Sequence, residues 1–261
     1  QGRLSVSPKN RLQFFPKNWR EEFKAAKKTN YDFIEFFSER KFNKNNPIWN
    51  SITLKEYSKL SKENNLKVLN FCDDYIISNS IRNKKTQNYL LRLLKNLSKL
   101  NIKNFILPMY GKSNLTDKNY FEYVDVLKMI LKKSKKIQIL IESNISPDEF
   151  QIFKKMINSK KLMFLFDTGN RINLKRDLYN DFERMYNNIG HIHIKDKNKK
   201  KQNVKITTGL VDFNKFFKII KKKKYNKNFT FETTRGSNPI ETAKNNILFI
   251  KNFLNKENNL C

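Results

Sequence analysis

Short apolar segments alternate with amphipathic segments along the whole chain. The apolar segments have the length of buried strands and are rich in Ile, Leu and Phe. Seven strands are predicted, at 31–37, 67–72, 104–109, 137–142, 162–167, 190–195 and 228–233. The amphipathic segments predict eight helices, near 17–28, 54–65, 82–99, 117–135, 147–158, 177–188, 212–224 and 239–255. Such alternation is typical of βαβ units and a parallel sheet.

Two of the predicted helices begin with capping residues. Ser146 precedes Pro147, and a Ser N-cap followed by Pro at the first helical position is a favoured start. Asp117 is the candidate N-cap of the helix near 117–135. These starts support the predicted division of the chain into strands and helices.

The number of elements favours an α/β fold of the TIM barrel type. Seven strands and eight helices are one strand short of a (β/α)8 barrel, so we expect a first strand to precede Gln1. The alternative is an open doubly wound sheet, which usually carries a glycine-rich turn after its first strand. No such turn is visible, and no linker divides the chain, so residues 1–261 are interpreted as a single barrel domain.

The charge of the chain is strongly positive, with 54 Lys and Arg against 24 Asp and Glu and a formal charge of +30. Such a charge is typical of proteins that bind nucleic acid or an anionic surface. Lysine is spread over the whole chain, however, and no P-loop, zinc-finger spacing or RNA-binding aromatic motif accompanies it. We therefore interpret the charge as a solvated surface, with a polyanion-binding patch as the alternative.

The remaining composition is that of a globular protein. Hydrophobic residues make up 38% of the chain, including 22 Phe, which is enough for a large core. No apolar run approaches the ~20 residues of a membrane span, so no membrane partner is expected. Cys72 and Cys261 do not suggest a disulfide framework, and a reducing compartment, the cytoplasm, is the expected location.

Candidate chemistry lies at the ends of four consecutive predicted strands. Each ends in an acid or a histidine: Glu142, Asp167, His193 and Glu232. Barrel enzymes carry their active sites at the C-terminal ends of the strands. Three carboxylates and an imidazole would there be suitable ligands for one divalent ion. Without a cation, the converging carboxylates would repel one another at a cost of several kcal/mol.

Several further residues are candidates for contact with a substrate. His191 and Lys195 share the His193 face of strand 190–195, although His191 lies deeper and packing is its alternative role. Glu35 ends the first predicted strand and is a candidate to orient a ligand or substrate. Arg235, just past Glu232, is a candidate anion contact.

The strand-end motifs also resemble those of a known family. "LIESN", "FDTGN", "HIHIKD" and "FTFET" stand in the order seen in the sugar phosphate isomerase/epimerase family. This family belongs to the xylose isomerase-like TIM barrel superfamily, which includes the AP endonuclease family 2 barrels. The stretches "QGRLS", "QFFPKNWREEFKAAKKTNYDFIEF" and "TTGLVDFNKFFKII" resemble other parts of one bacterial branch, so the likeness covers essentially the whole chain.

The resemblance implies a metal-dependent isomerase or epimerase of a sugar or sugar phosphate. It makes Glu142, Asp167, His193 and Glu232 the ligands of one ion, with Mn²⁺ favoured and Mg²⁺, Co²⁺ or Zn²⁺ as alternatives. Glu142 and Glu232 would also be the catalytic acid/base pair, transferring a proton through an enediolate on opposite faces of a ketose. Each positioned acid or base typically contributes ~10²–10⁴-fold.

Two positions depart from the family pattern and leave the substrate open. Asn170 stands where relatives often have a histidine, and Lys199 where they often have an arginine. Both positions contact substrate in the relatives. Asn170 can still hydrogen-bond a hydroxyl, and Lys199 can meet a phosphate as a point charge. The sugar, its phosphorylation and any homo-oligomer therefore stay open.

Three alternative functions remain. A dehydratase of a sugar or inosose would use the same metal site with a proton donor for the leaving hydroxyl. Nucleic-acid processing, as in the AP endonuclease branch, would need a multinuclear zinc centre with many histidines, whereas His191 and His193 are the only two in the chain. A barrel that has lost its activity is the third alternative, and the intact ligand set argues against it.

Overall fold

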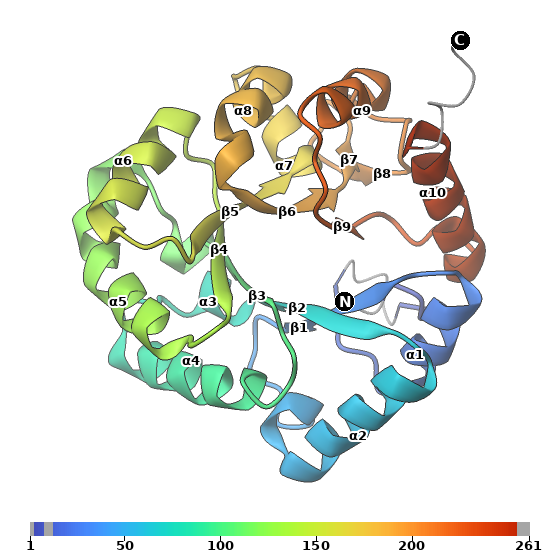
Figure 1. The fold of residues 1–261 in the computed structure, drawn as a ribbon, viewed down its shortest axis with the longest axis horizontal. Helices are drawn as coiled ribbons and strands as arrows, with labels where there is room; N and C mark the ends of the chain where they lie inside the picture. The colour runs from blue at the N-terminus through green and yellow to red at the C-terminus, as the bar shows by residue number, and fades with distance from the viewer. Residues whose placement is uncertain (1–2, 8–12, 255–261) are drawn as a thin grey trace.

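The structure, a computed structural model, describes residues 3–7 and 13–254. Seven parallel strands form one sheet that curves into a barrel, with the helices outside it (Figure 1). The strands are β1 (Phe33–Ser38), β2 (Lys67–Asp73), β3 (Asn104–Pro108), β4 (Gln138–Glu142), β5 (Leu162–Asp167), β6 (Ile189–Ile194) and β9 (Phe229–Phe231), and they neighbour one another in this order. The predicted α/β fold of the TIM barrel type is confirmed.

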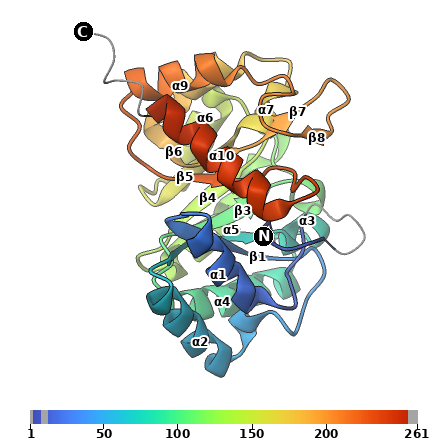
Figure 2. The same cartoon turned by 90° about the vertical axis from the view of Figure 1, so that its right-hand side faces the viewer.

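Eight longer helices connect the strands, close to the predicted ranges. They are α1 (Trp19–Lys28), α2 (Ser51–Glu63), α4 (Lys84–Leu97), α5 (Tyr120–Lys133), α6 (Pro147–Ile157), α8 (Leu178–Met185), α9 (Phe213–Lys222) and α10 (Pro239–Leu254). Figure 2 shows α10 lying along the side of the barrel between α9 and α1. The last predicted helical residue, 255, lies outside the described residues.

The hydrophobic side chains form two separate clusters, as the barrel geometry requires. Side chains alternate across each strand, so one set points outward under the helices and forms the large cluster. The other set points inward and forms a small plug inside the barrel, made of Phe37, Cys72, Ile106, Leu140, Met163 and Leu165. The inward-facing residues at the C-terminal ends of the strands are polar, and they lie above this plug.

Local capping explains where two helices begin. Ser146 and Glu149 form a reciprocal capping box ahead of Pro147, so the predicted start of α6 is confirmed. The predicted cap at Asp117 is wrong. Thr116 caps a short 3₁₀ turn at Asp117–Asn119, and α5 begins only after that turn.

Four short elements were not predicted from the hydrophobic pattern. The helices α3 (Tyr75–Ser78) and α7 (Thr168–Ile172) follow β2 and β5 directly. The strands β7 (Asp196–Lys197) and β8 (Asn203–Val204) pair in a small antiparallel ribbon after β6. None of them is long enough to show a period. All four follow the C-terminal ends of strands, where they shape the mouth of the barrel.

The barrel has a slot between β1 and β9. Within the described residues, β1 pairs with β2 alone and β9 with β6 alone. A cavity of about 330 Å³ lies between these strands and is also lined by residues of α1 and α10. The strand that we expect before Gln1 lies outside the described residues.

Two smaller predictions concern membranes and cysteines. Over the described part of the chain, no helix is both long and apolar enough to cross a membrane. Cys72 is buried and forms no disulfide, and Cys261 lies outside the described residues.

Candidate metal centre and active site

The four predicted strand-end residues all lie at the C-terminal mouth of the barrel. Glu142 and Asp167 are the last residues of β4 and β5, His193 lies near the end of β6, and Glu232 directly follows β9. Their exposed fractions are between 1% and 5%. Glu142, His193 and Glu232 line a cavity of about 400 Å³. The parallel register sets Asp167 beside His193.

Three of these residues form a compact group, which we call the rim triad: Asp167, His193 and Glu232. One potential ligand atom from each lies within 4.8 Å of the other two. Glu142 is not part of this group. Its Oε1 accepts hydrogen bonds from Asn170 Nδ2 (2.6 Å) and from the hydroxyl of Tyr110 (3.3 Å). The structure therefore separates Glu142 from the other three predicted ligands.

Asp167 is held by the short helix that follows it. Its Oδ1 accepts the backbone N–H of Asn170 at 2.7 Å and so caps the N-terminus of α7. This bond engages Oδ1 and leaves Oδ2 for other contacts. Oδ2 lies 2.9 Å from the Lys195 ammonium, as an ion pair whose angles do not meet those of a hydrogen bond.

Glu232 is contacted differently on its two carboxylate oxygens. Oε1 accepts hydrogen bonds from Gln13 and from Arg3, the latter at 3.4 Å. Oε2 pairs with the Lys195 ammonium and lies 3.4 Å from His193 Nδ1. Oε2 is therefore the oxygen that faces the other members of the rim triad.

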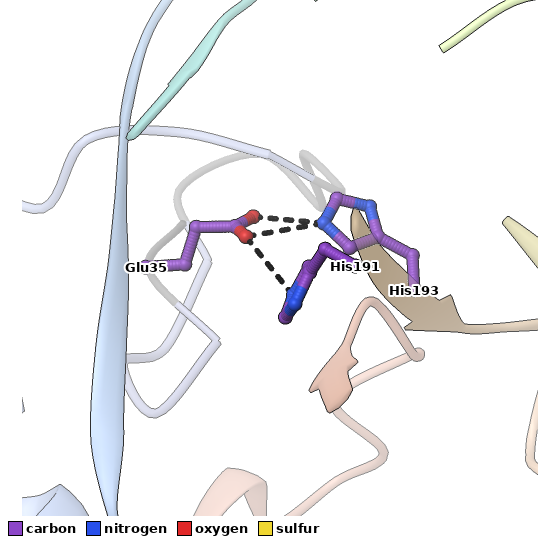
Figure 3. A group of neighbouring side chains, drawn as sticks. All are labelled: Glu35, His191 and His193. Atoms are coloured by element: carbon purple, nitrogen blue, oxygen red, sulfur yellow. Dashed lines mark hydrogen bonds and ion pairs between the residues drawn. The ribbon is translucent and has the colours of Figure 1, made fainter. Parts of the chain in front are cut away.

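A second cluster lies deeper in the barrel, and we call it the buried network: Glu35, Asn70, His191 and Thr230. Glu35 Oε2 receives hydrogen bonds from Asn70 Nδ2 (3.1 Å) and Thr230 Oγ1 (3.3 Å), and it lies 3.1 Å from His193 Nε2. His191 Nε2 lies 2.9 Å from Asn70 Nδ2 and 2.7 Å from Thr230 Oγ1. Figure 3 shows Glu35 facing both histidine rings.

His193 joins the two clusters through its two ring nitrogens. Nε2 faces Glu35, whereas Nδ1 has no hydrogen-bond partner within the described residues and faces Glu232. A histidine that ligates a metal commonly donates its other ring N–H to a carboxylate, which fixes the ring and its tautomer. The Glu35–His193 contact has this arrangement.

Burial and neighbouring charges shift the pKa values of these residues in opposite directions. Burial, then Asp167 and Glu232, raise the pKa of Glu142 to about 8. Burial alone would also raise the pKa of Glu232, but Lys195 and His193 outweigh it and hold that pKa well below its usual range. Burial would lower the pKa of His193, yet Glu35 and Glu232 raise it well above its usual value.

Only some of the residues that were predicted to contact a substrate line the cavity at the mouth of the barrel. Asn170 and Lys195 line the 400 Å³ cavity. Lys199 is exposed after β7 and does not line it, nor does Arg235, whose guanidinium lies 4.9 Å from the ring of Phe14. Glu35 and His191 belong to the buried network instead.

The cavity also contains polar residues that the sequence analysis did not identify. They are Gln13, Arg40, Tyr110, Asn144, Asn173, Lys197 and Lys201. Lys197 donates a hydrogen bond to Asn170 Oδ1 at 2.6 Å. Lys197 and Tyr110 lie close behind the ends of β6 and β3. For Lys197 and Tyr110, the position just after a predicted strand was the one feature of the sequence that could have indicated a place at the cavity.

The donor set of the rim triad suits a divalent ion. Carboxylates and imidazoles bind Mn²⁺, Zn²⁺ and related divalent ions. Asp167 Oδ2 and His193 Nδ1 are buried and make no hydrogen bond within the described residues. Such atoms are costly unless a charge or a ligand meets them. The Lys195 ammonium already meets Asp167 Oδ2 at 2.9 Å, whereas His193 Nδ1 faces Glu232 Oε2 at 3.4 Å. These three residues therefore fit a metal ion.

Comparison with known proteins gives a family and a set of similar folds. The family model for the xylose isomerase-like TIM barrel matches residues 23–253. Among curated proteins, no match is found. Many solved structures share the fold.

Three of these structures illustrate the likeness. An L-ribulose 3-epimerase has a TM-score of 0.77 and 14% identity, covering 93% of this chain and 91% of its own. D-psicose 3-epimerase from Clostridium cellulolyticum H10 has a TM-score of 0.73 and 14% identity, covering 92% of this chain and 95% of its own. The IolI protein, with a bound zinc atom, has a TM-score of 0.70 and 14% identity, covering 91% of this chain and 92% of its own. At these identities the likeness establishes the fold.

Proposed function

Because the chain belongs to the xylose isomerase-like TIM barrel family, we propose that it is a divalent-metal-dependent isomerase or epimerase of a sugar or sugar phosphate. The rim triad is the observation that carries this proposal, since its ligand atoms converge at the mouth of the barrel. The similar structures include epimerases of psicose and ribulose and a protein that binds zinc. These similarities support a small sugar as substrate.

The proposed metal site consists of Asp167, His193 and Glu232, with Mn²⁺ as the favoured ion. A divalent ion there would act as a Lewis acid and stabilise negative charge that develops on the substrate oxygens. The contact between Glu35 and His193 Nε2 would keep His193 Nδ1 directed at the ion. Glu142 is either a fourth, more distant ligand or a purely catalytic group.

Glu142 and Glu232 are the proposed acid/base pair. They belong to β4 and to the segment after β9, which lie on different sides of the barrel mouth (Figure 1). A ketose between them would present opposite faces to the two carboxyl groups. One glutamate would remove a proton and the other would return one, so the centre inverts. Return of the proton to the neighbouring carbon would instead interconvert an aldose and a ketose.

Other cavity residues would hold the sugar in position. Asn170 and Tyr110 both contact Glu142 and line the same cavity. Their hydrogen bonds would fix the carboxyl group against the substrate. Besides Lys195, the cations at the cavity are Arg40, Lys197 and Lys201, and they could meet a phosphate group. Their presence favours a sugar phosphate over a neutral sugar.

The proposal is tested by metal-linked stability and by proton exchange. Chelator-stripped protein is melted in the presence of increasing Mn²⁺, and an ion at 100 times its dissociation constant should add ~2.7 kcal/mol to the native state. With Mn²⁺ present, the protein should incorporate solvent deuterium at the carbon next to the carbonyl of one ketose in a panel of free and phosphorylated sugars. Glu232→Gln should lose both effects.

A matched substitution controls for the loss of one carboxylate. Glu241 lies on the exposed first turn of α10, and Glu241→Gln should keep both effects. A folded wild-type protein whose melting temperature does not respond to Mn²⁺, Mg²⁺, Co²⁺ or Zn²⁺ would contradict the metal site. A melting temperature that responds to the ion, without deuterium incorporation into any sugar, would support the metal site and contradict the proposed reaction.

A further inference from the structure

We propose that Lys195 is a built-in counter-ion, whose ammonium occupies the place between Asp167 and Glu232 that a divalent ion takes and is displaced when the ion binds. This inference rests on the proposed function, because it concerns the same metal site. It assigns to Lys195 a role that neither the family match nor the similar folds supply. Lys195 would stabilise the protein without metal and lower its affinity for metal.

The position of the ammonium supports this role. Lys195 Nζ lies 2.9 Å from Asp167 Oδ2 and forms an ion pair with Glu232 Oε2. Glu232 Oε2 is also the oxygen that lies 3.4 Å from His193 Nδ1. The lysine is only 5% exposed, and a buried ammonium persists only where carboxylates compensate for its lost hydration. A cation is therefore already present between two of the proposed ligands.

The backbone after β5 holds the lysine in this position. Thr168 Oγ1 accepts the backbone N–H of Lys195 at 3.0 Å and lies 2.6 Å from its carbonyl oxygen. Gly169 lies directly against the side chain, because a Cβ at this position would come within 2.5 Å of Lys195 Cγ. No other residue type fits here without moving the lysine. The "FDTGN" segment thus supplies both a proposed ligand and the space for the competing cation.

The same geometry permits the ammonium to move. The contacts with Thr168 fix the backbone of Lys195, and Gly169 packs against the first carbons of its side chain. Lys195 also lines the cavity of about 400 Å³. Displacement of the ammonium into this cavity would then need rotation about the last bonds of the side chain only. The displaced ammonium would stay at the cavity, where it would face an oxygen of the substrate.

Calorimetric titration of Mn²⁺ into chelator-stripped Lys195→Met measures the competition. We expect this variant to bind Mn²⁺ about 10- to 100-fold more tightly than wild type, because the ion no longer has to break a charge-assisted contact. Lys197→Met is the matched control. It removes the same charge from the same cavity, but its ammonium is bonded to the amide of Asn170. Its affinity should change by less than about threefold.

Melting of the metal-free proteins gives the second measurement. Without Mn²⁺, Lys195→Met should melt about 5–10 °C below wild type, because two buried carboxylates lose their counter-ion. Lys197→Met should stay within about 2 °C. If Lys195→Met does not fold, Lys195→Gln replaces it, because the glutamine amide can still donate a hydrogen bond to a carboxylate without carrying charge.

The outcomes separate this inference from the proposed function. Equal or weaker Mn²⁺ binding by folded Lys195→Met, with normal binding by wild type, overturns the counter-ion role and leaves the proposed metal site intact. Absence of binding of Mn²⁺, Mg²⁺, Co²⁺ and Zn²⁺ by both proteins overturns the proposed metal site and, with it, the displacement of Lys195. Where wild type binds the ion, an unchanged metal-free melting temperature of Lys195→Met also overturns the counter-ion role.

Discussion

The rim triad and the buried network contain the same kinds of side chain but differ in how many hydrogen bonds those side chains form. Each combines histidine and carboxylate atoms within 4.8 Å of one another, and His193, a member of the rim triad, also contacts Glu35 of the buried network. In the buried network, one oxygen of Glu35 is within hydrogen-bond distance of three neighbours. In the rim triad, Asp167 Oδ2 and His193 Nδ1 are buried without a hydrogen bond among the described residues.

This difference shows that residue type and spacing do not define a metal site. A carboxylate that already receives several hydrogen bonds gains little from a metal ion and would lose those bonds on binding it. In the rim triad, Asp167 Oδ2 and Glu232 Oε2 pair with the Lys195 ammonium, so a divalent ion would replace one cation there rather than break a network of hydrogen bonds. We therefore interpret the buried network as support for His193 and the rim triad as the site that receives the ion.

The largest expected effect separates Glu142 from the rim triad. Glu142→Gln should lower turnover by ~10²–10⁴-fold, because a positioned acid or base is lost. Its Mn²⁺ affinity should fall by less than about tenfold, since Glu142 stands outside the compact group and is bonded to Asn170. Turnover and calorimetric affinity are measured on the same preparation. A loss of affinity as large as that of Asp167→Asn would make Glu142 a full ligand.

The next effect tests whether the buried network supports the metal site. Glu35→Gln should weaken Mn²⁺ binding ~10–100-fold, which is typical when the outer partner of a ligating histidine is changed. The glutamine still accepts a hydrogen bond but carries no charge. Calorimetry gives the affinity, and a melting curve without metal separates it from loss of folding. Unchanged affinity would mean that His193 is oriented by its own packing.

A smaller effect is expected at the other histidine of the buried network. His191→Phe keeps a ring against Phe33, whose centroid lies 6.0 Å from that of His191, and removes the contacts to Asn70 and Thr230. The free energy of unfolding should fall by ~1–3 kcal/mol. The Mn²⁺ affinity of the folded protein should change by less than about threefold. A tenfold loss of affinity would place His191 in the metal site.

We expect the smallest effect on Mn²⁺ affinity at Asp73. This residue tests whether a single carboxylate oxygen that lacks a hydrogen bond is enough to make a metal site. Asp73 Oδ1 accepts hydrogen bonds from Ser38 and Tyr89, whereas Oδ2 is buried without a hydrogen bond among the described residues. It belongs to neither ligand group, so Asp73→Asn should leave the Mn²⁺ affinity unchanged. The same calorimetric titration checks this.

Asp73 should instead appear in the pH dependence of stability. Burial, opposed by hydrogen bonds from Ser38 and Tyr89, raises its pKa to about 7. The folded protein then holds a proton that the unfolded chain releases near pH ~3.9. Its contribution is therefore full below that pH and is lost as the pH rises through about 7. Urea unfolding of Asp73→Asn between pH 5 and pH 8 should show a flatter curve than wild type, and parallel curves would refute the assignment.

The fold was predictable because buried parallel strands leave a clear pattern. β5 and β6 consist of residues that are all buried, and such strands appear in sequence as short apolar runs. The polar residue at the end of each run then marks the mouth of the barrel. The positions of Glu142, Asp167, His193 and Glu232 could be predicted in this way, without any knowledge of distances.

The contacts within the site could not be predicted, because they join segments that are remote in sequence. Asn70 and Thr230 are polar residues inside strands, and alternation gives the face on which each lies but not the partner that it contacts. Arg3 and Gln13 reach Glu232 from the other end of the chain. Glu142 is bonded to Asn170 and Tyr110. These are tertiary contacts, and no local pattern reports them.

The slot between β1 and β9 has a consequence for how the mouth of the barrel moves. A strand with one hydrogen-bonded neighbour opens more easily than a strand held on both sides, and amide hydrogen exchange measures this difference. Within the described residues, β1 and β9 have one such neighbour each, whereas β2 to β6 have two. β1 carries Glu35, and Glu232 directly follows β9. For residues 1–261 alone, we therefore expect faster amide exchange in β1 and β9 than in β2 to β6, and a strand before Gln1 that filled the slot would remove this difference.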